Sequence, residues 1–166
     1  MISASPRCNA NAMHTTLIST DTLAAHRDDS TWLIADCRYN LKDENCGRAQ
    51  YEVSHIAGAV FVNLAHDLAA PRTGSNGRHP LPSPQAMAAT FGRLGISNSM
   101  QVIAYDQDAG AFASRLWWML RYLRHDRSPC STAASRSGRA KVVPSAVVPR
   151  CGRPRASSRG CANICG

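Results

Sequence analysis

The chain has 166 residues, and its 19 Lys and Arg outnumber its 11 Asp and Glu, which gives a formal net charge of +8 at pH 7. This length suits one domain with a core of its own. No run of about 18 apolar residues is present, which argues against a membrane-spanning helix. The first residues also lack the apolar stretch of a secretory signal. We therefore expect a cytoplasmic protein with no membrane partner.

The excess of positive over negative residues lies entirely at one end of the chain. Residues 1–126 contain all 11 acidic residues and as many Lys and Arg, whereas residues 127–166 contain seven Arg, one Lys and no acidic or aromatic residue. A segment of that composition cannot build a core. We therefore predict a disordered extension at residues 1–12, a folded domain at 13–126 and a disordered, basic, low-complexity tail at 127–166.

Two functions are open to the basic tail. Its charge suits electrostatic binding of nucleic acid, but it has no aromatic residue for stacking on bases. Cys151, Cys161 and Cys165 suggest zinc, but no Cys-x-x-Cys pair occurs and no histidine follows His125. We predict no nucleic-acid partner, no metal and no cofactor.

Short apolar runs alternate with helical patterns from residue 14 onward, which predicts an α/β domain. Ser19 or Thr20 is expected to cap a short helix. Residues 31–35 are a candidate buried strand, and residues 59–62 are a second one. Residues 64–82 are so rich in Pro, Gly, Asn and Arg that they predict a long irregular loop.

The second half of the domain ends in a strand, a loop and a helix. Ser83 and the proline after it cap a helix that Gly95 closes. Residues 102–105 form the strongest strand of the chain, and residues 112–123 carry the apolar stripe of a final helix. The loop between them, residues 106–111, follows the carboxyl end of a strand, where open α/β sheets hold their ligands. Chemistry is therefore expected first in this loop.

Residues 51–59, Tyr-Glu-Val-Ser-His-Ile-Ala-Gly-Ala, closely resemble the rhodanese signature, except that Ala57 replaces its proline. Residues 33–38, 78–82, 102–106 and 115–121 agree with the same family. Together they make the chain resemble the N-terminal domain of a two-domain thiosulfate or 3-mercaptopyruvate sulfurtransferase. The resemblance implies a rhodanese-like three-layer fold with a mainly parallel central sheet, which we expect to be incomplete here.

In that family a cysteine of the second domain carries the transferred sulfur, and Asp106 occupies the corresponding position here. A carboxylate cannot carry a transferable sulfur, so we expect this chain alone to be inactive. The intact family uses a small sulfur donor and a thiol or cyanide acceptor. The missing C-terminal catalytic domain is then the natural interface partner, and either Trp117 or Trp118 is expected to cover that interface while the other enters the core. A non-catalytic binding or regulatory module is the alternative.

His79 is the remaining site candidate. In the mercaptopyruvate branch a histidine in the matching loop is proposed to assist the catalytic site from across the domain interface. The acidic partner proposed for it falls at Ala65 here, with Asp67 two residues further on. The alternative interpretation is that His79 only forms hydrogen bonds within a proline-rich loop.

Four further residues are interpreted as structural. His55 precedes a glycine turn, where its imidazole can bond loop carbonyls. Asp36 and Arg38 suggest a local ion pair or turn bond at a strand end, and Cys37 a buried thiol.

A second enzyme class shares part of the pattern. Residues 102–108 resemble the strand and Asp-x-Asp start of haloacid-dehalogenase-like phosphatases, in which the first aspartate is the nucleophile and Mg²⁺ a cofactor. The Gly-Thr, the later lysine and the acidic pair of that class are missing, so this alternative is weak.

A shifted reading frame explains residues 127–166 best. With G/C-rich codons, the same nucleotides moved by two positions can encode Leu-Ala-Val-Leu-Asp-Gly-Gly, the continuation typical of the family. The shift also explains the abrupt gain of Arg, Pro, Ser, Gly and Cys in the tail.

Overall fold

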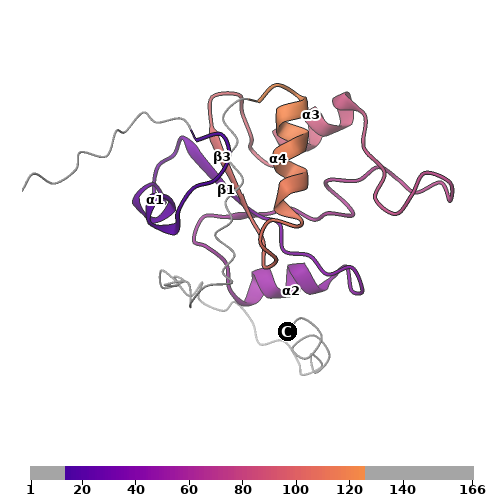
Figure 1. The fold of residues 1–166 in the computed structure, drawn as a ribbon, viewed down its shortest axis with the longest axis horizontal. Helices are drawn as coiled ribbons and strands as arrows, with labels where there is room; N and C mark the ends of the chain where they lie inside the picture. Colours follow the sequence, from indigo (N-terminus) through magenta and orange to yellow (C-terminus); the bar gives the residue numbers. More distant parts are fainter. Residues whose placement is uncertain (1–13, 126–166) are drawn as a thin grey trace, which may run out of the picture.

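A computed structural model describes residues 14–125, so the predictions for residues 1–12 and 127–166 lie outside the described residues. Its centre is a parallel sheet in the order β2 (Val60–Phe61), β1 (Trp32–Asp36) and β3 (Gln101–Tyr105) (Figure 1). All three predicted strands are present. The register aligns Trp32 with Gln101 and Asp36 with Tyr105, so β1 and β3 end at the same edge.

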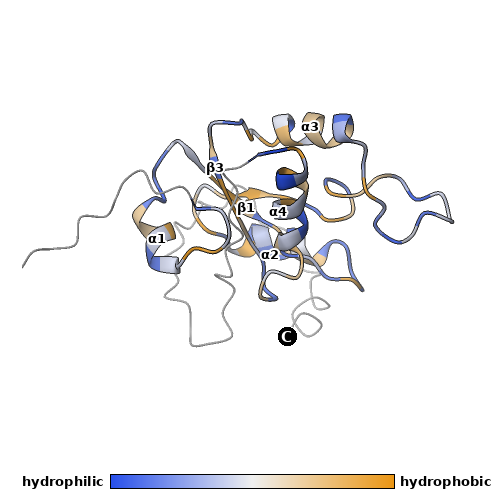
Figure 2. Ribbon diagram, turned by 45° about the horizontal axis from the view of Figure 1, so that its top comes forward, coloured by the Kyte–Doolittle hydropathy of each residue, from blue (hydrophilic) through white to orange (hydrophobic). Residues whose placement is uncertain are grey.

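Successive strand residues point to opposite faces of the sheet, and apolar side chains stand on both faces here. Helices therefore cover both faces. On one face Ala35, Val102 and Ala104 pack in a core with α3 (Pro84–Arg93) and α4 (Ala113–Tyr122). On the other face Ile34 and Ile103 pack with Leu23 of α1 (Thr20–Ala25). Figure 2 shows the hydrophobic colour on the central strands. The predicted layered α/β fold with a parallel sheet is confirmed.

The predicted helix starts are confirmed by their caps. The Ser19 Oγ accepts a hydrogen bond from the Thr22 N–H at 3.1 Å, and the Ser83 Oγ accepts one from the Ala86 N–H at 3.2 Å. Each bond satisfies an N–H that the first turn of the helix leaves unpaired. None of the helices in residues 14–125 is long and apolar enough to cross a membrane.

The helix α2 (Cys46–Val53) was not predicted from the sequence. It has only two buried residues, and Val53 at its end is 85% exposed, so it shows little of the apolar periodicity that identifies a helix. A tertiary contact fixes its place. Gly47 lies so close to β1's following loop that a β carbon there would collide with the Arg38 carbonyl.

The predicted long loop runs between β2 and α3 and projects from the body of the domain (Figure 1). Arg115 of α4 closes the base of this loop. Its Nε donates to the Leu68 carbonyl at 2.9 Å, and its Nη2 donates to the carbonyls of His79 at 3.0 Å and Pro80 at 3.2 Å. The Ala70 N–H also donates to the Pro80 carbonyl at 2.9 Å. The two ends of the loop are therefore held together against α4.

Candidate functional site

Asp106 lies at the carboxyl end of β3 in a cradle of backbone N–H groups. Its Oδ1 accepts from Asp108 at 2.9 Å and Gly110 at 2.8 Å, and its Oδ2 accepts from Phe112 at 2.7 Å and Ala113 at 2.9 Å. The residue is 2% exposed. The predicted site loop thus has the form of an anion-binding nest, and the carboxylate that fills it belongs to the chain itself.

Two backbone features make the N–H groups converge. Ala109 and Gly110 both have positive φ, 53° and 91°, which turns successive N–H groups toward the same side of the loop. Phe112 and Ala113 stand at the start of α4, where the first N–H groups have no partner within the helix and the helix dipole favours an anion. Glycine tolerates this conformation, whereas Ala109 adopts it at a steric cost.

The hydrogen bonds decide what Asp106 can do chemically. Each carboxylate oxygen accepts two N–H groups, so its lone pairs are occupied and neither oxygen is available to a metal or a substrate. This geometry does not suit the nucleophile and Mg²⁺ ligand of a phosphatase. No cluster of His, Cys, Asp or Glu in the described part of the chain has an arrangement that would hold a metal.

Asp36 and Arg38 form the expected ion pair beside this loop. Asp36 is fully buried, and its Oδ2 lies 2.6 Å from the Arg38 Nη2 and accepts a 2.6 Å hydrogen bond from the Tyr105 hydroxyl. Burial, and then the charge of Asp36, raise the pKa of Tyr105, so this hydroxyl remains a donor. Arg38 also donates to the Ser54 carbonyl at 2.6 Å. The network ties β1, β3 and the end of α2 together.

His79 lies in the long loop between β2 and α3. Burial lowers its pKa, and the positive charges of Arg72, Arg78 and Arg115 lower it further. Its Nε2 is buried without a hydrogen-bond partner, and its ring stands edge-on to Tyr39 with the ring centroids 5.8 Å apart. The expected bond within the loop is therefore not made by this nitrogen.

Asp67, the acid that lies two residues after the expected position of the partner at Ala65, has a different role. Asp67 accepts from the Asn63 N–H at 2.8 Å and from the Arg93 Nη2 at 2.9 Å. It caps the turn after β2 and pairs with α3. Ala65 offers no carboxylate and Asp67 is engaged by Asn63 and Arg93, so the acid implied by the resemblance is not provided by either residue.

The other predicted structural residues occupy supporting positions. The His55 Nδ1 lies 2.7 Å from the Tyr51 carbonyl oxygen and its ring stacks on Tyr51 at 4.0 Å. Cys37 is buried at 2% exposure. Trp117 packs against the core and Trp118 is 45% exposed, which confirms that the two indoles serve different surfaces.

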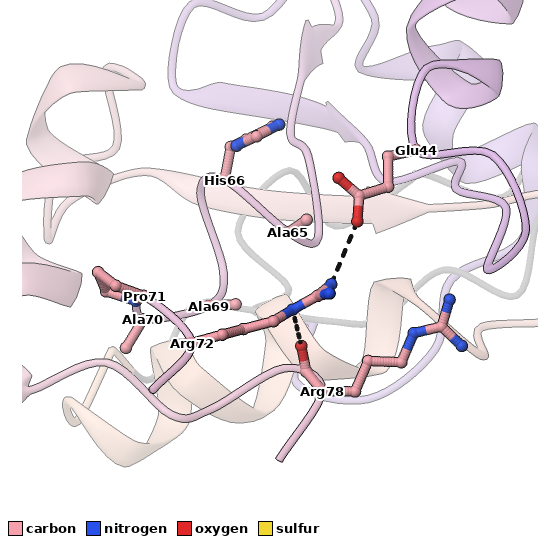
Figure 3. A pocket seen from close by; sticks show the side chains of 8 residues that line it. All are labelled: Glu44, Ala65, His66, Ala69, Ala70, Pro71, Arg72 and Arg78. Atoms are coloured by element: carbon pink, nitrogen blue, oxygen red, sulfur yellow. Dashed lines mark hydrogen bonds and ion pairs between the residues drawn. The ribbon is translucent and has the colours of Figure 1, made fainter. Parts of the chain in front are cut away.

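The sequence did not predict a pocket of about 380 Å³ beside the long loop. It is lined by Glu44, His66, Arg72 and Arg78, with small residues between them (Figure 3). These residues come from segments up to 34 positions apart, so no local motif reveals them. The only sequence signal was the density of arginine in the Pro- and Gly-rich loop.

Comparison with known proteins agrees with this geometry. Residues 19–133 match the Rhodanese-like domain family. A Pseudomonas aeruginosa protein named "Probable 3-mercaptopyruvate sulfurtransferase" is 43% identical over 108 residues, which are 64% of this chain and 38% of that protein. Thiosulfate/3-mercaptopyruvate sulfurtransferase 2 of Arabidopsis thaliana is 37% identical over 112 residues, 67% of this chain and 32% of that protein.

A solved structure gives the same result. The 3-mercaptopyruvate sulfurtransferase from Leishmania major superposes with a TM-score of 0.64 at 30% identity, covering 70% of this chain and 32% of that chain. The present chain thus spans about a third of the length of these relatives. The family match covers most of residues 14–125 and includes the Asp106 loop. The chain belongs to the rhodanese-like domain family.

Proposed function

We propose that this chain is the non-catalytic first domain of a sulfurtransferase that moves sulfur from thiosulfate or 3-mercaptopyruvate to a thiol or cyanide, and that the chain alone is inactive. The observation that carries the proposal is the filled cradle at Asp106. A persulfide needs a cysteine in an anion-binding loop, because a thiolate is the nucleophile. Here four N–H groups bind a carboxylate instead.

The names of the relatives support the same proposal. Both curated relatives and the superposed structure carry sulfurtransferase names, and each is about three times longer than the matched part. The remaining length has room for a second domain that supplies the nucleophile. Our proposed partner is that catalytic domain, with the exposed Trp118 of α4 as the expected contact.

A thiocyanate assay tests the proposal. The full chain is incubated with cyanide and either thiosulfate or 3-mercaptopyruvate, alone and together with the C-terminal part of the Pseudomonas aeruginosa relative. We expect no thiocyanate from the chain alone and faster turnover by the C-terminal part when the chain is added. Turnover by the chain alone, or no gain on mixing, would overturn the proposal.

A binding or regulatory module is the second candidate, and an exposed aromatic pair favours it. Trp118 and Tyr122 are 45% and 52% exposed, and their rings stack with centroids 5.2 Å apart. Exposed aromatic patches mark interaction surfaces. If the mixing assay shows no gain, pull-down with this chain and its Trp118→Ser variant tests the module directly: loss of a bound protein in the variant supports it.

Two further proposals concern the protein in its cell. A thiol acceptor stays reduced in the cytosol, so we propose a cytoplasmic location, to be tested by fractionation. We also propose that residues 127–166 are a frameshifted product that leaves the domain truncated, because acidic and aromatic residues are absent from this segment while Arg, Pro, Ser, Gly and Cys become abundant. Sequencing the gene beyond the His125 codon tests this: a shift that restores Leu-Asp-Gly-Gly supports it, and its absence contradicts it.

A further inference from the structure

The pocket beside the long loop has an excess of positive charge. Two guanidinium groups, those of Arg72 and Arg78, belong to the residues that line it. Glu44 is the one carboxylate among the residues that line this pocket. Two guanidinium groups and one carboxylate leave a surplus of one positive charge at the pocket, which attracts a small anion.

The two pocket arginines are placed differently. The Arg72 Nη2 pairs with the Glu44 Oε1 at 3.1 Å, and its Nε donates to the Arg78 carbonyl at 2.7 Å. Both side chains of this ion pair are about half exposed, 50% and 42%. Arg78 donates to the Leu41 carbonyl, and no carboxylate in the described residues pairs with it. The Arg78 guanidinium therefore has no carboxylate partner among the described residues and is available to an anionic ligand. The Arg72 guanidinium would be shared between Glu44 and that ligand.

Two buried polar atoms lie within the electrostatic influence of these arginines. The Tyr39 hydroxyl is buried without a hydrogen-bond partner in a residue that is 1% exposed, and the His79 Nε2 beside it is in the same state. Burial and the charge of Glu44 raise the pKa of Tyr39, while the charges of Arg78 and Arg72 lower it, so the charged groups of the pocket act on this hydroxyl. Buried unpaired groups are uncommon, and they often mark places where function rather than stability decides the residue.

The pocket is also preformed. Arg115 and the Ala70–Pro80 hydrogen bond close the loop at its base, so the loop needs little ordering before a ligand binds. Within the loop, the Asn76 side chain bonds the Pro71 carbonyl at 3.0 Å and the Thr73 N–H at 2.9 Å. The volume of the pocket, about 380 Å³, is at the small end for ligand pockets, which excludes large cofactors.

We infer that Arg72 and Arg78 form a binding site for a small anion, a carboxylate or a sulfur oxyanion, and that Glu44 competes with this anion for Arg72. Guanidinium groups suit both chemistries because their fork matches two oxygens at once. The choice of these anions rests on the proposed function, since sulfur donors of this family are small anions. The binding itself does not require sulfur transfer.

The test is a titration of the ¹⁵N-labelled full chain with sodium thiosulfate, sodium pyruvate and, at matched ionic strength, sodium chloride. The amides of Ala69 and Ala70, which line the pocket, report binding. We expect saturable shifts with thiosulfate, pyruvate or both, with a dissociation constant in the millimolar range. Saturation by thiosulfate alone identifies a sulfur-oxyanion site, and saturation by pyruvate alone identifies a carboxylate site. Shifts that are linear and the same with chloride would overturn the inference.

Variants separate the roles of the three side chains. Arg72→Gln or Arg78→Gln should weaken binding at least about fivefold, whereas Glu44→Gln should strengthen it about threefold because the competing carboxylate is gone. The exposed pair Arg27 and Asp28, 2.9 Å apart, is the matched control, and neutralising either residue should change nothing.

Two results would contradict the assignment of the arginines. One is unchanged binding in Arg78→Gln, and the other is weaker binding in Glu44→Gln. Arg72→Lys keeps the positive charge but loses the planar guanidinium geometry, so its binding should be intermediate between those of the unchanged chain and Arg72→Gln. A dispersed spectrum of this variant shows that weaker binding does not come from unfolding. Because no readout depends on turnover, failure of the thiocyanate assay leaves this test intact.

Discussion

Replacing Asp106 with asparagine should destabilise the domain strongly. The amide has one oxygen and one NH2 where the carboxylate has two oxygens. If its oxygen faces Asp108 and Gly110, its NH2 faces the N–H groups of Phe112 and Ala113, and the opposite rotamer only exchanges the pairs. Two buried donors lose their acceptor in either case, at a cost of about 1–3 kcal/mol each, so we expect a loss of about 2–6 kcal/mol.

Urea denaturation followed by tryptophan fluorescence measures this loss. With a slope of about 2 kcal/mol per molar, a loss of about 4 kcal/mol lowers the midpoint by about 2 M. Such a loss is a large part of the roughly 5–15 kcal/mol by which domains are stable. Asp108→Asn is the control, since its side chain is exposed, and it should shift stability by less than about 0.5 kcal/mol. A midpoint for Asp106→Asn as high as that of the control would refute the account of the cradle.

Single changes at Asp106, Arg38 and Tyr39 and the titration of His79 test the cradle, the buried ion pair and the surroundings of the long loop. Asp106→Cys places a thiol among four N–H groups at a helix start, so its alkylation should continue to lower pH than that of an ordinary thiol. Arg38→Gln leaves the buried Asp36 carboxylate without its cation and should cost about 3–5 kcal/mol. Tyr39→Phe removes a buried unpaired hydroxyl and should leave stability unchanged or raise it by about 1 kcal/mol. His79 should titrate by NMR below about 6.5, the usual histidine pKa, because burial and three arginines disfavour its charged form. Since its folded-state pKa is the lower one, it contributes stability above pH 6.5 that is lost as the pH falls through the folded-state pKa.

Controls are available for each of these. Asp108→Cys supplies an exposed thiol on the same loop, and equal alkylation profiles at the two positions would contradict the cradle's effect. Arg27→Gln breaks an exposed ion pair and should cost less than about 1 kcal/mol. A loss above about 2 kcal/mol in Tyr39→Phe would mean that the hydroxyl has a partner. A His79 midpoint at or above 6.5 would mean that its surroundings do not disfavour the cation.

The strands and three of the helices were predictable because their signals are local. Ser19 and Ser83 mark helix starts through the bonds that their own side chains make, and residues 102–105 are apolar throughout because both faces of β3 are buried. The helix α2 was not predictable, because its position depends on Gly47 approaching the Arg38 backbone, a contact between segments that the chain does not place together locally.

The site shows the same division. The sequence predicted a site loop after residues 102–105, and the resemblance implied that Asp106 stands where the family has its cysteine, since both inferences depend on the residues that follow one strand. It did not indicate that both carboxylate oxygens would be saturated by N–H groups, because this depends on the positive φ of Ala109 and Gly110. Periodicity says nothing about such backbone angles. The pocket of Arg72 and Arg78 was missed for a related reason, since Glu44 reaches it from a different part of the chain.

Tyr39 connects the loop that follows β3 with the long loop that carries His79. Its backbone N–H and carbonyl are both bonded by the Gln107 side chain, at 3.3 and 2.7 Å, which fixes it to the loop that Asp106 organises. Its ring contacts Phe112 on one side and His79 on the other, with centroids 5.6 and 5.8 Å apart. The carboxylate in the cradle therefore has a structural consequence beyond its own oxygens. It orders the loop after β3, and Gln107 of that loop fixes the backbone of Tyr39, whose ring packs on Phe112 and on His79 of the long loop.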